Sequence, residues 1–148
     1  MILIIYKKAT LKYEILEKYT AGIELVGAEV KTLRKKLGNL DGSRVIVRGG
    51  EVFVVGMTIP PYQANNTPKE YDPARTRRLL LTKREIKELA NAEMKKRLTI
   101  VPLSVYNDRH LLKMQVAIVH GKNKADKREY LKRKDAQREA QRALGSKH

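Results

Sequence analysis

Cysteine is missing from all 148 residues of the chain. This absence excludes a disulfide scaffold, a thiol nucleophile, an iron–sulfur cluster and every cysteine-based zinc site. No apolar run approaches the roughly 18 residues that a membrane-spanning helix needs. The apolar stretch at residues 1–5 is shorter than the apolar region of a secretion signal, and nothing resembling a cleavage site follows it. We therefore expect a cytoplasmic protein that does not contact a membrane.

Aromatic residues are scarce, and the common catalytic motifs are absent. The chain has one Phe, no Trp and seven scattered Tyr, whereas proteins that bind single strands stack bases on exposed rings. The phosphate-binding loop, the dinucleotide fingerprint, the zinc-protease motif and the nucleophile elbow are all absent. We therefore expect no enzymatic activity, no cofactor and no metal.

Three pairs of polar residues are the remaining candidates for chemistry. His110 near Asp108 could be half of an acid–base pair, although we favour a solvated histidine in a hairpin turn. Glu24 with Glu29, or Glu70 with Asp72, could hold a metal ion. Carboxylates near helix starts more often act as caps or as partners of the helix dipole, so none of these pairs predicts a catalytic site.

A large excess of positive charge is the strongest compositional signal. Lys and Arg number 32 against 16 Asp and Glu, which gives a net charge of +16 and a pI of about 10.1. Residues 121–148 carry ten Lys/Arg and four Asp/Glu, a net +6, so residues 1–120 hold the other +10. Such a charge favours a polyanionic partner, with nucleic acid ahead of an anionic membrane. Because both parts are basic, two separate anionic contacts are possible.

Residues 1–121 read as a mainly β body. Two antiparallel hairpins are expected, one turning at Gly49-Gly50 and one at residues 107–109, after a broken extended segment over residues 13–26. Helices are expected at residues 30–37, at 73–81 after Asp72-Pro73, and at 83–96 after the capping box Thr82-Lys83-Arg84-Glu85. About six strands with three short helices predict a closed six-stranded antiparallel barrel of the oligonucleotide-binding (OB) kind. A four-stranded α+β sandwich is the alternative.

Residues 122–148 differ from the body because their apolar residues are mostly alanine. They form only a thin stripe at helical spacing, which is too little to hold a lone helix in water. We expect a flexible basic tail that is disordered when free and helical when bound to an anionic surface.

Several blocks of sequence are more specific than the composition. They read YTAGIEL at 19–25, GAEVKTLR at 27–34, DPARTRRLLLTKREI at 72–86, and LTIVPL at 98–103 followed by GK at 121–122 and DKR at 126–128. In this order they resemble the small protein B (SmpB) family, the protein partners of transfer-messenger RNA (tmRNA, also called SsrA). The similarity covers almost the whole chain.

The resemblance implies a function as well as a fold. It implies a six-stranded OB-related barrel with three helices that binds the tRNA-like domain of tmRNA. It also implies a monomeric, non-enzymatic adaptor that delivers tmRNA to stalled ribosomes for trans-translation, with its tail helical in the empty mRNA channel near the decoding centre. A generic ribosomal or cold-shock-like barrel protein is the first alternative, and an RNA-processing enzyme is the second.

The resemblance also implies which residues contact RNA. The RNA-binding residues of the body would be Lys7, Lys8, Thr20, Lys31, Arg34, Arg75, Arg77, Arg78, Leu80, Thr82, Lys83, Arg84 and Lys122. The ribosome-binding residues of the tail would be Lys124, Asp126, Lys127, Arg128, Tyr130, Lys132, Arg133, Lys134 and Arg138. Arg34, Arg75 and Arg77 are phosphate candidates because a guanidinium stays charged, whereas Glu29 is expected to orient a neighbour or cap its helix.

Four positions depart from the family pattern. Tyr6 replaces a usual Asn, Thr20 a usual Glu, Asn123 a usual Lys, and Ala125 a usual His or Tyr. A carboxylate–base hydrogen bond from position 20 and stacking from position 125 are therefore not expected in this chain.

Overall fold

The computed structural model describes residues 1–63, 68–122, 131–133 and 135–138. Within these residues seven strands form one antiparallel sheet, accompanied by three short helices. The strands are β1 (Ile2–Ile5), β2 (Tyr13–Ile23), β3 (Arg44–Arg48), β4 (Glu51–Val55), β5 (Arg77–Leu80), β6 (Leu98–Asp108) and β7 (Leu111–Gly121). The helices are α1 (Ala9–Lys12), α2 (Gly27–Arg34) and α3 (Lys83–Glu93).

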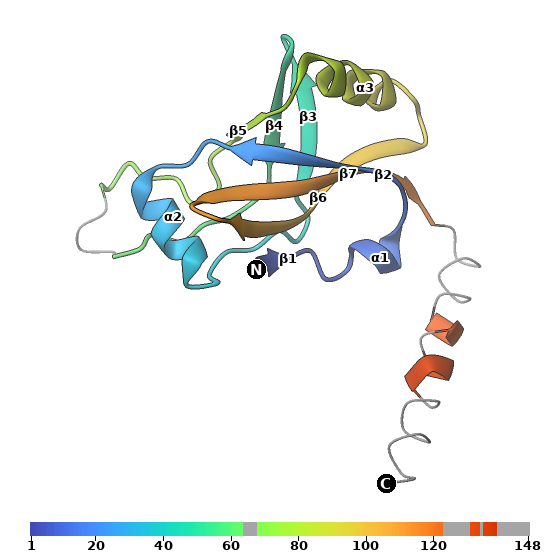
Figure 1. The fold of residues 1–148 in the computed structure, drawn as a ribbon, viewed down its shortest axis with the longest axis horizontal. Helices are drawn as coiled ribbons and strands as arrows, with labels where there is room; N and C mark the ends of the chain where they lie inside the picture. Colours follow the sequence, from blue (N-terminus) through green and yellow to red (C-terminus); the bar gives the residue numbers. More distant parts are fainter. Residues whose placement is uncertain (64–67, 123–130, 134, 139–148) are drawn as a thin grey trace, which may run out of the picture.

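Three long strands form the centre of the sheet, whose order is β1-β6-β7-β2-β5-β4-β3. β2, β6 and β7 each have 11 residues, and they lie side by side across the body in Figure 1. The β6–β7 hairpin lies between β1 and β2, which are neighbours along the chain. A bulge between Ile15 and Glu17 interrupts the β2–β7 register, but β2 is one continuous strand rather than the broken segment expected.

The expected closed six-stranded barrel is not what the strand ladders form. The sheet has seven strands. One of them is the short β1, which pairs antiparallel with β6 and was not predicted from the sequence. The order ends at β1 on one side and β3 on the other, and no ladder joins these two strands in the described part of the chain. β3 contacts β6 across the curled sheet. The sheet is therefore strongly curved, but no hydrogen-bonded ladder closes it into a barrel among the described residues.

A helix was expected at residues 73–81, and this prediction is wrong. The backbone N–H of Arg75 donates to the Asp72 carbonyl at 3.1 Å, and the N–H of Ala74 donates to Asp72 Oδ1 at 2.9 Å. Asp72-Pro73 therefore makes a local turn of the kind that Asp side chains favour. β5 follows with side chains alternately buried and exposed, which is the period of a strand.

Two locally encoded features are confirmed. Gly49 and Gly50 have φ of 59° and 75°, the left-handed values that a two-residue hairpin turn requires, and β3 pairs with β4 on either side of them. Thr82 accepts a hydrogen bond from the Glu85 N–H at 3.2 Å, and Glu85 Oε1 accepts one from the Thr82 N–H at 3.0 Å. This reciprocal capping box starts α3 where the sequence predicted it.

The hydrophobic core is formed by the sheet together with α2 and α3, and runs of consecutive buried residues in β6 and β7 show that both faces of these strands are covered. Leu33 of α2 and Leu89 of α3 are fully buried, together with Met114 and Val116 of β7. Each Å² of apolar surface that is buried stabilises the fold by about 25 cal/mol, so this packing is the main stabilising contribution. The core therefore fixes the positions of both helices relative to the sheet.

The described part of the tail consists of residues 131–133 and 135–138. Its backbone is helical and every one of its residues is exposed. The change from disorder to helix on binding remains a prediction.

Candidate RNA-binding surface

Three of the predicted RNA contacts come together in one shallow hollow. Thr20 of β2, Leu80 at the end of β5 and Thr82 at the start of α3 line a space of about 400 Å³. Gly22 pairs with Leu80 across the β2–β5 ladder, and a Cβ at Gly22 would lie 3.2 Å from Leu80 Cβ. The glycine thus lets β5 lie close to β2, and residues from three separate sequence blocks share one surface.

The hollow also contains a cation that the sequence did not single out. Lys113 of β7 lines it beside Thr20 and Thr82, because β7 pairs with β2 and places Lys113 opposite Gly22. The Lys113 ammonium lies 2.9 Å from Asp108 Oδ2, and its hydrogen bond to that carboxylate raises the pKa of Lys113. No sequence motif marks this lysine, and only the β2–β7 register could have identified it.

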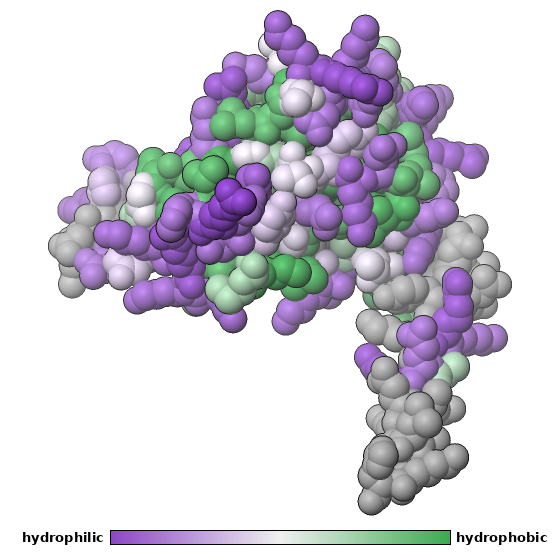
Figure 2. Space-filling model, viewed as in Figure 1, coloured by the Kyte–Doolittle hydropathy of each residue, from purple (hydrophilic) through white to green (hydrophobic). Residues whose placement is uncertain are grey.

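The hollow and its surroundings are polar and carry both signs of charge, since Glu85 lines the space together with Lys113. The Tyr106 hydroxyl donates to Thr20 Oγ1 at 3.4 Å, which joins β6 to the wall formed by β2. Lys83 and Arg84, in the first turn of α3, are exposed, and Arg84 makes only a 3.5 Å ion pair with Glu88. Hydrophilic residues cover most of the face shown in Figure 2, with hydrophobic ones between them. A surface of this kind suits phosphates together with the apolar faces of bases.

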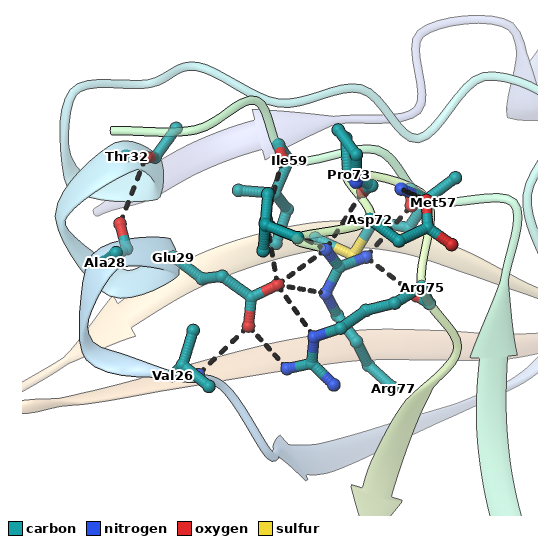
Figure 3. A network of polar contacts seen from close by, with 12 residues as sticks. Val26, Ala28, Glu29, Thr32, Met57, Ile59, Asp72, Pro73, Arg75 and Arg77 are labelled. Carbon is teal, nitrogen blue, oxygen red and sulfur yellow. Dashed lines mark hydrogen bonds and ion pairs between the residues drawn. The ribbon is translucent and has the colours of Figure 1, made fainter. Parts of the chain in front are cut away.

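A buried charge cluster lies between α2 and the segment that leads into β5 (Figure 3). Glu29 has a fully buried side chain and contacts both Arg75 and Arg77. Arg77 donates from Nε and Nη2 to Glu29 Oε2, at 2.9 and 2.6 Å. It also donates to the carbonyls of Met57, Pro73 and Arg75, each at 3.0 Å, and from Nη2 to the Tyr71 hydroxyl at 3.4 Å. The guanidinium is thus satisfied from within the protein.

Arg77 is therefore not a phosphate contact, which corrects the expectation from the sequence. Its side chain is 0% exposed, because β5 is a strand whose odd residues face inward. Arg75 is one-third exposed. It donates from Nη2 to Glu29 Oε1 at 2.5 Å and to the Glu24 carbonyl at 3.5 Å, and from Nε to Glu29 Oε2 at 3.1 Å, so these bonds use Nε and Nη2 of its guanidinium but not Nη1. The RTRR sequence at 75–78 does not by itself reveal that its first two arginines, Arg75 and Arg77, belong to a buried structural cluster.

Glu29 also caps α2, as expected for a carboxylate in the first turn. Its Oε1 accepts from the Val26 N–H at 3.0 Å, while Oε2 accepts from the Tyr71 hydroxyl at 3.1 Å. Burial by itself would raise the pKa of Glu29, but the hydrogen bonds from Arg75, Val26 and Arg77 outweigh it and lower the pKa from 4.5 to about 2. The cluster therefore carries one negative and two positive charges at neutral pH and ties α2 to β5.

The other predicted contacts of the body lie outside the hollow. Arg34 donates to the His110 carbonyl at 3.1 Å, and Arg78 pairs with Glu24 and Glu51 at 3.3 and 3.6 Å. Lys122 Nζ donates to the Thr10 carbonyl at 2.6 Å. Lys7, Lys8 and Lys31 are exposed.

The tail contacts divide between described and undescribed residues. Lys132, Arg133 and Arg138 are exposed and helical. Lys124, Asp126, Lys127, Arg128, Tyr130 and Lys134 lie outside the described residues, as do the departures at Asn123 and Ala125.

None of the candidates for catalytic or metal chemistry is assembled. His110 is exposed in the β6–β7 turn, and the Asp108 carboxylate faces Lys113 instead. Glu24 pairs with Arg78, and Glu29 with the two buried-cluster arginines. Among the described residues, no group of three or more His, Cys, Asp or Glu could hold a metal ion. A search of the same residues finds no helix that is both long and apolar enough to span a membrane.

The curled antiparallel sheet, and a hollow that gathers three of the expected RNA contacts beside Lys113, are consistent with a small β protein of the RNA-binding class. The chain belongs to the SmpB family: the family model described as SmpB protein matches residues 3–146. An SsrA-binding protein of Rubrobacter xylanophilus is 45% identical over 139 residues, which cover 93% of this chain and 91% of the relative. One of Gloeothece citriformis is 42% identical over 138 residues, covering 93% and 89%.

A solved structure agrees with this assignment. It is described as "tmRNA-SmpB: a journey to the center of the bacterial ribosome" and matches with a TM-score of 0.68 and 36% sequence identity, covering 86% of this chain and 93% of that one. The similarity to known proteins therefore extends to both sequence and fold.

Proposed function

We propose that this protein binds the tRNA-like domain of tmRNA and delivers it to stalled ribosomes for trans-translation. The observation that carries the proposal is the hollow, which unites Thr20, Leu80 and Thr82 with the cation Lys113 in a member of the SmpB family. A folded RNA is recognised by shape, by phosphate contacts and by stacking on unpaired bases. The exposed Leu80 offers the apolar contact, and Lys113 together with the nearby Lys83 and Arg84 offers the charge.

The protein acts in this scheme as a cytoplasmic, monomeric and non-enzymatic adaptor. Besides the hollow, the exposed Lys7, Lys8, Lys31, Arg34 and Arg78 contribute to the field that attracts RNA, and Lys122 marks the start of the tail. The tail lies in the empty mRNA channel of the ribosome as a helix, where its cations face ribosomal RNA. A generic ribosomal or cold-shock-like protein is the less favoured function, because few rings are available for stacking single strands.

Binding to a transcribed tRNA-like domain tests the proposal directly. The affinity should fall steeply with salt, because each neutralised phosphate releases about 0.7–0.9 counterions. The variants Leu80→Ala and Lys113→Gln should each weaken binding, whereas Lys96→Gln, an exposed cation between α3 and β6, should change it much less. The RNA should be recovered unmodified and uncut.

Two results would contradict this function. One is an affinity that does not change between low and high salt. The other is an equal loss of affinity for Lys113→Gln and Lys96→Gln, which would reduce the hollow to one part of a diffuse basic surface.

A further inference from the structure

A second concave site lies beside the N-terminal end of α2 and contains none of the residues of the hollow. It has a volume of about 420 Å³ and is lined mainly by apolar groups: Val26, Ala28, Glu29, Pro60, Pro61, Tyr62, Pro68, Glu70 and Tyr71. Its volume falls within the range of about 300–1,000 Å³ that is usual for ligand pockets. We call it the Tyr62 pocket.

The buried charge cluster holds the wall of the Tyr62 pocket in place. The Tyr71 hydroxyl lies 2.8 Å from the Ile59 carbonyl and 3.1 Å from Glu29 Oε2. These contacts hold the Tyr71 ring in place in the pocket wall. Glu29 itself is held by Arg75 and Arg77. The pocket is therefore formed before any ligand arrives, which lowers the entropic cost of binding.

The rim of the Tyr62 pocket is basic. Lys35 Nζ lies 4.8 Å from the centroid of the Tyr62 ring, and Lys31 Nζ lies 5.7 Å from it. Lys69 is exposed next to the lining residue Glu70. Lys31 and Lys35 thus lie at the edge of an apolar, ring-lined space with Lys69 nearby. Of its two lining carboxylates, Glu29 is already paired with Arg75 and Arg77, and Glu70 is exposed. This combination matches a nucleotide, whose flat base seeks apolar and aromatic walls and whose flanking phosphates seek cations.

We propose that the Tyr62 pocket receives an unpaired base of the bound RNA, with Lys31 and Lys35 holding the flanking phosphates. The proposal rests on the function proposed above and adds to the hollow a second contact built from different residues. A peptide would find the same apolar walls, but the lysine pair at Tyr62 favours a polyanion. Two separate contacts would recognise the shape of a folded RNA rather than a length of single strand.

The test uses the full chain with ¹³C-labelled methyl groups and a transcribed tRNA-like domain. Adding the RNA should shift the methyl signals of Val26 and Ala28, which line the pocket. Tyr62→Leu should weaken RNA binding about tenfold, since base–ring stacking contributes about 1–3 kcal/mol. Tyr62→Trp, which keeps a stacking surface, should bind as tightly as the wild type. Phe53→Leu removes a half-buried ring of β4 outside the pocket and should leave the affinity unchanged.

Each other outcome overturns the proposal in a different way. The wild type could bind the RNA tightly while the methyl signals do not move and Tyr62→Leu keeps full affinity. This result would exclude the pocket as an RNA contact and leave the proposed function intact. A loss of affinity without methyl shifts would show that Tyr62 acts only through the fold. Methyl shifts on adding ribosomes but not the RNA would assign the pocket to a ribosomal partner. Failure of the wild type to bind the RNA would overturn both proposals.

Discussion

Glu29 of α2 binds two arginines that lie about 46–48 residues further along the chain. Arg77 and Glu29 are both 0% exposed, and the one-third exposed Arg75 contacts the second carboxylate oxygen. Removing one partner of a buried ion pair leaves the other charge in a medium that solvates it poorly. We therefore expect these residues to contribute mainly to the stability of the fold.

Arg77→Ala should lower the free energy of unfolding by about 3–5 kcal/mol, because Glu29 loses its most buried partner. Arg78→Ala, next to it on β5 with a side chain 44% exposed, should change stability by less than about 0.5 kcal/mol. Urea unfolding of the two variants measures the difference. Equal and small effects would show that the Glu29–Arg77 pair adds nothing to stability.

The same carboxylate makes stability depend on acid. The pKa of Glu29 is about 2 in the folded protein against 4.5 ordinarily, so its contribution is complete above about pH 4.5 and is lost as the pH falls toward 2. Between pH 5 and pH 2 the wild type should lose about 3 kcal/mol more unfolding free energy than Glu29→Gln, which has no proton to bind. Parallel curves for the two proteins in acid would contradict this expectation.

At the scale of elements, features set by sequence neighbours could be predicted and features set by distant partners could not. The Gly49-Gly50 turn and the Thr82–Glu85 capping box depend on four or fewer consecutive residues, and both are confirmed. β1 and β5 have only four residues each, and their pairing with β6 and with β2 and β4 decides their conformation. Local propensity therefore suggested a helix where the sheet imposes a strand.

The same distinction applies to the candidate site. The family resemblance placed Thr20, Leu80 and Thr82 on the RNA side, and the structure brings these three together. It could not reveal Lys113, which enters the hollow only through the β2–β7 register. It also could not separate the exposed Arg78 from the buried Arg77, because strand alternation at β5 was not foreseen.

The start of α3 offers a prediction about a single element. Thr82→Ala should destabilise the protein by about 1 kcal/mol, since the cap of the Glu85 N–H is lost. Thr82→Ser retains the hydroxyl and should lose only a few tenths of a kcal/mol. Thermal unfolding measures both variants, and an RNA-binding assay then shows whether the Thr82 methyl group also contributes to the hollow. Equal melting temperatures for the alanine and serine variants would rule out a stabilising cap.

At the scale of the whole molecule, two basic regions should serve two partners. Ending the chain after residue 125 should leave the affinity for the tRNA-like domain nearly unchanged and abolish peptide tagging on stalled ribosomes. The fold should survive, because the described tail residues are all exposed, and Lys122, whose N–H donates to the Lys12 carbonyl at 2.9 Å, is retained. Binding and tagging assays on the truncated chain measure the two effects. Equal losses in both assays would place the tail within the first RNA site.

The insertion of the β6–β7 hairpin between β1 and β2 determines when the chain can fold during its own synthesis. β1 leaves the ribosome first, yet Ile2 pairs with Tyr106 and Tyr13 pairs with Gly121. The β3–β4 hairpin can form early, whereas the first two strands must wait until nearly the whole body has been made. Pairings this distant in sequence are slow to form. Nascent chains that stop before residue 98 should therefore be cut readily by protease at β1 and β2, and resistance should appear only after residue 121 has emerged.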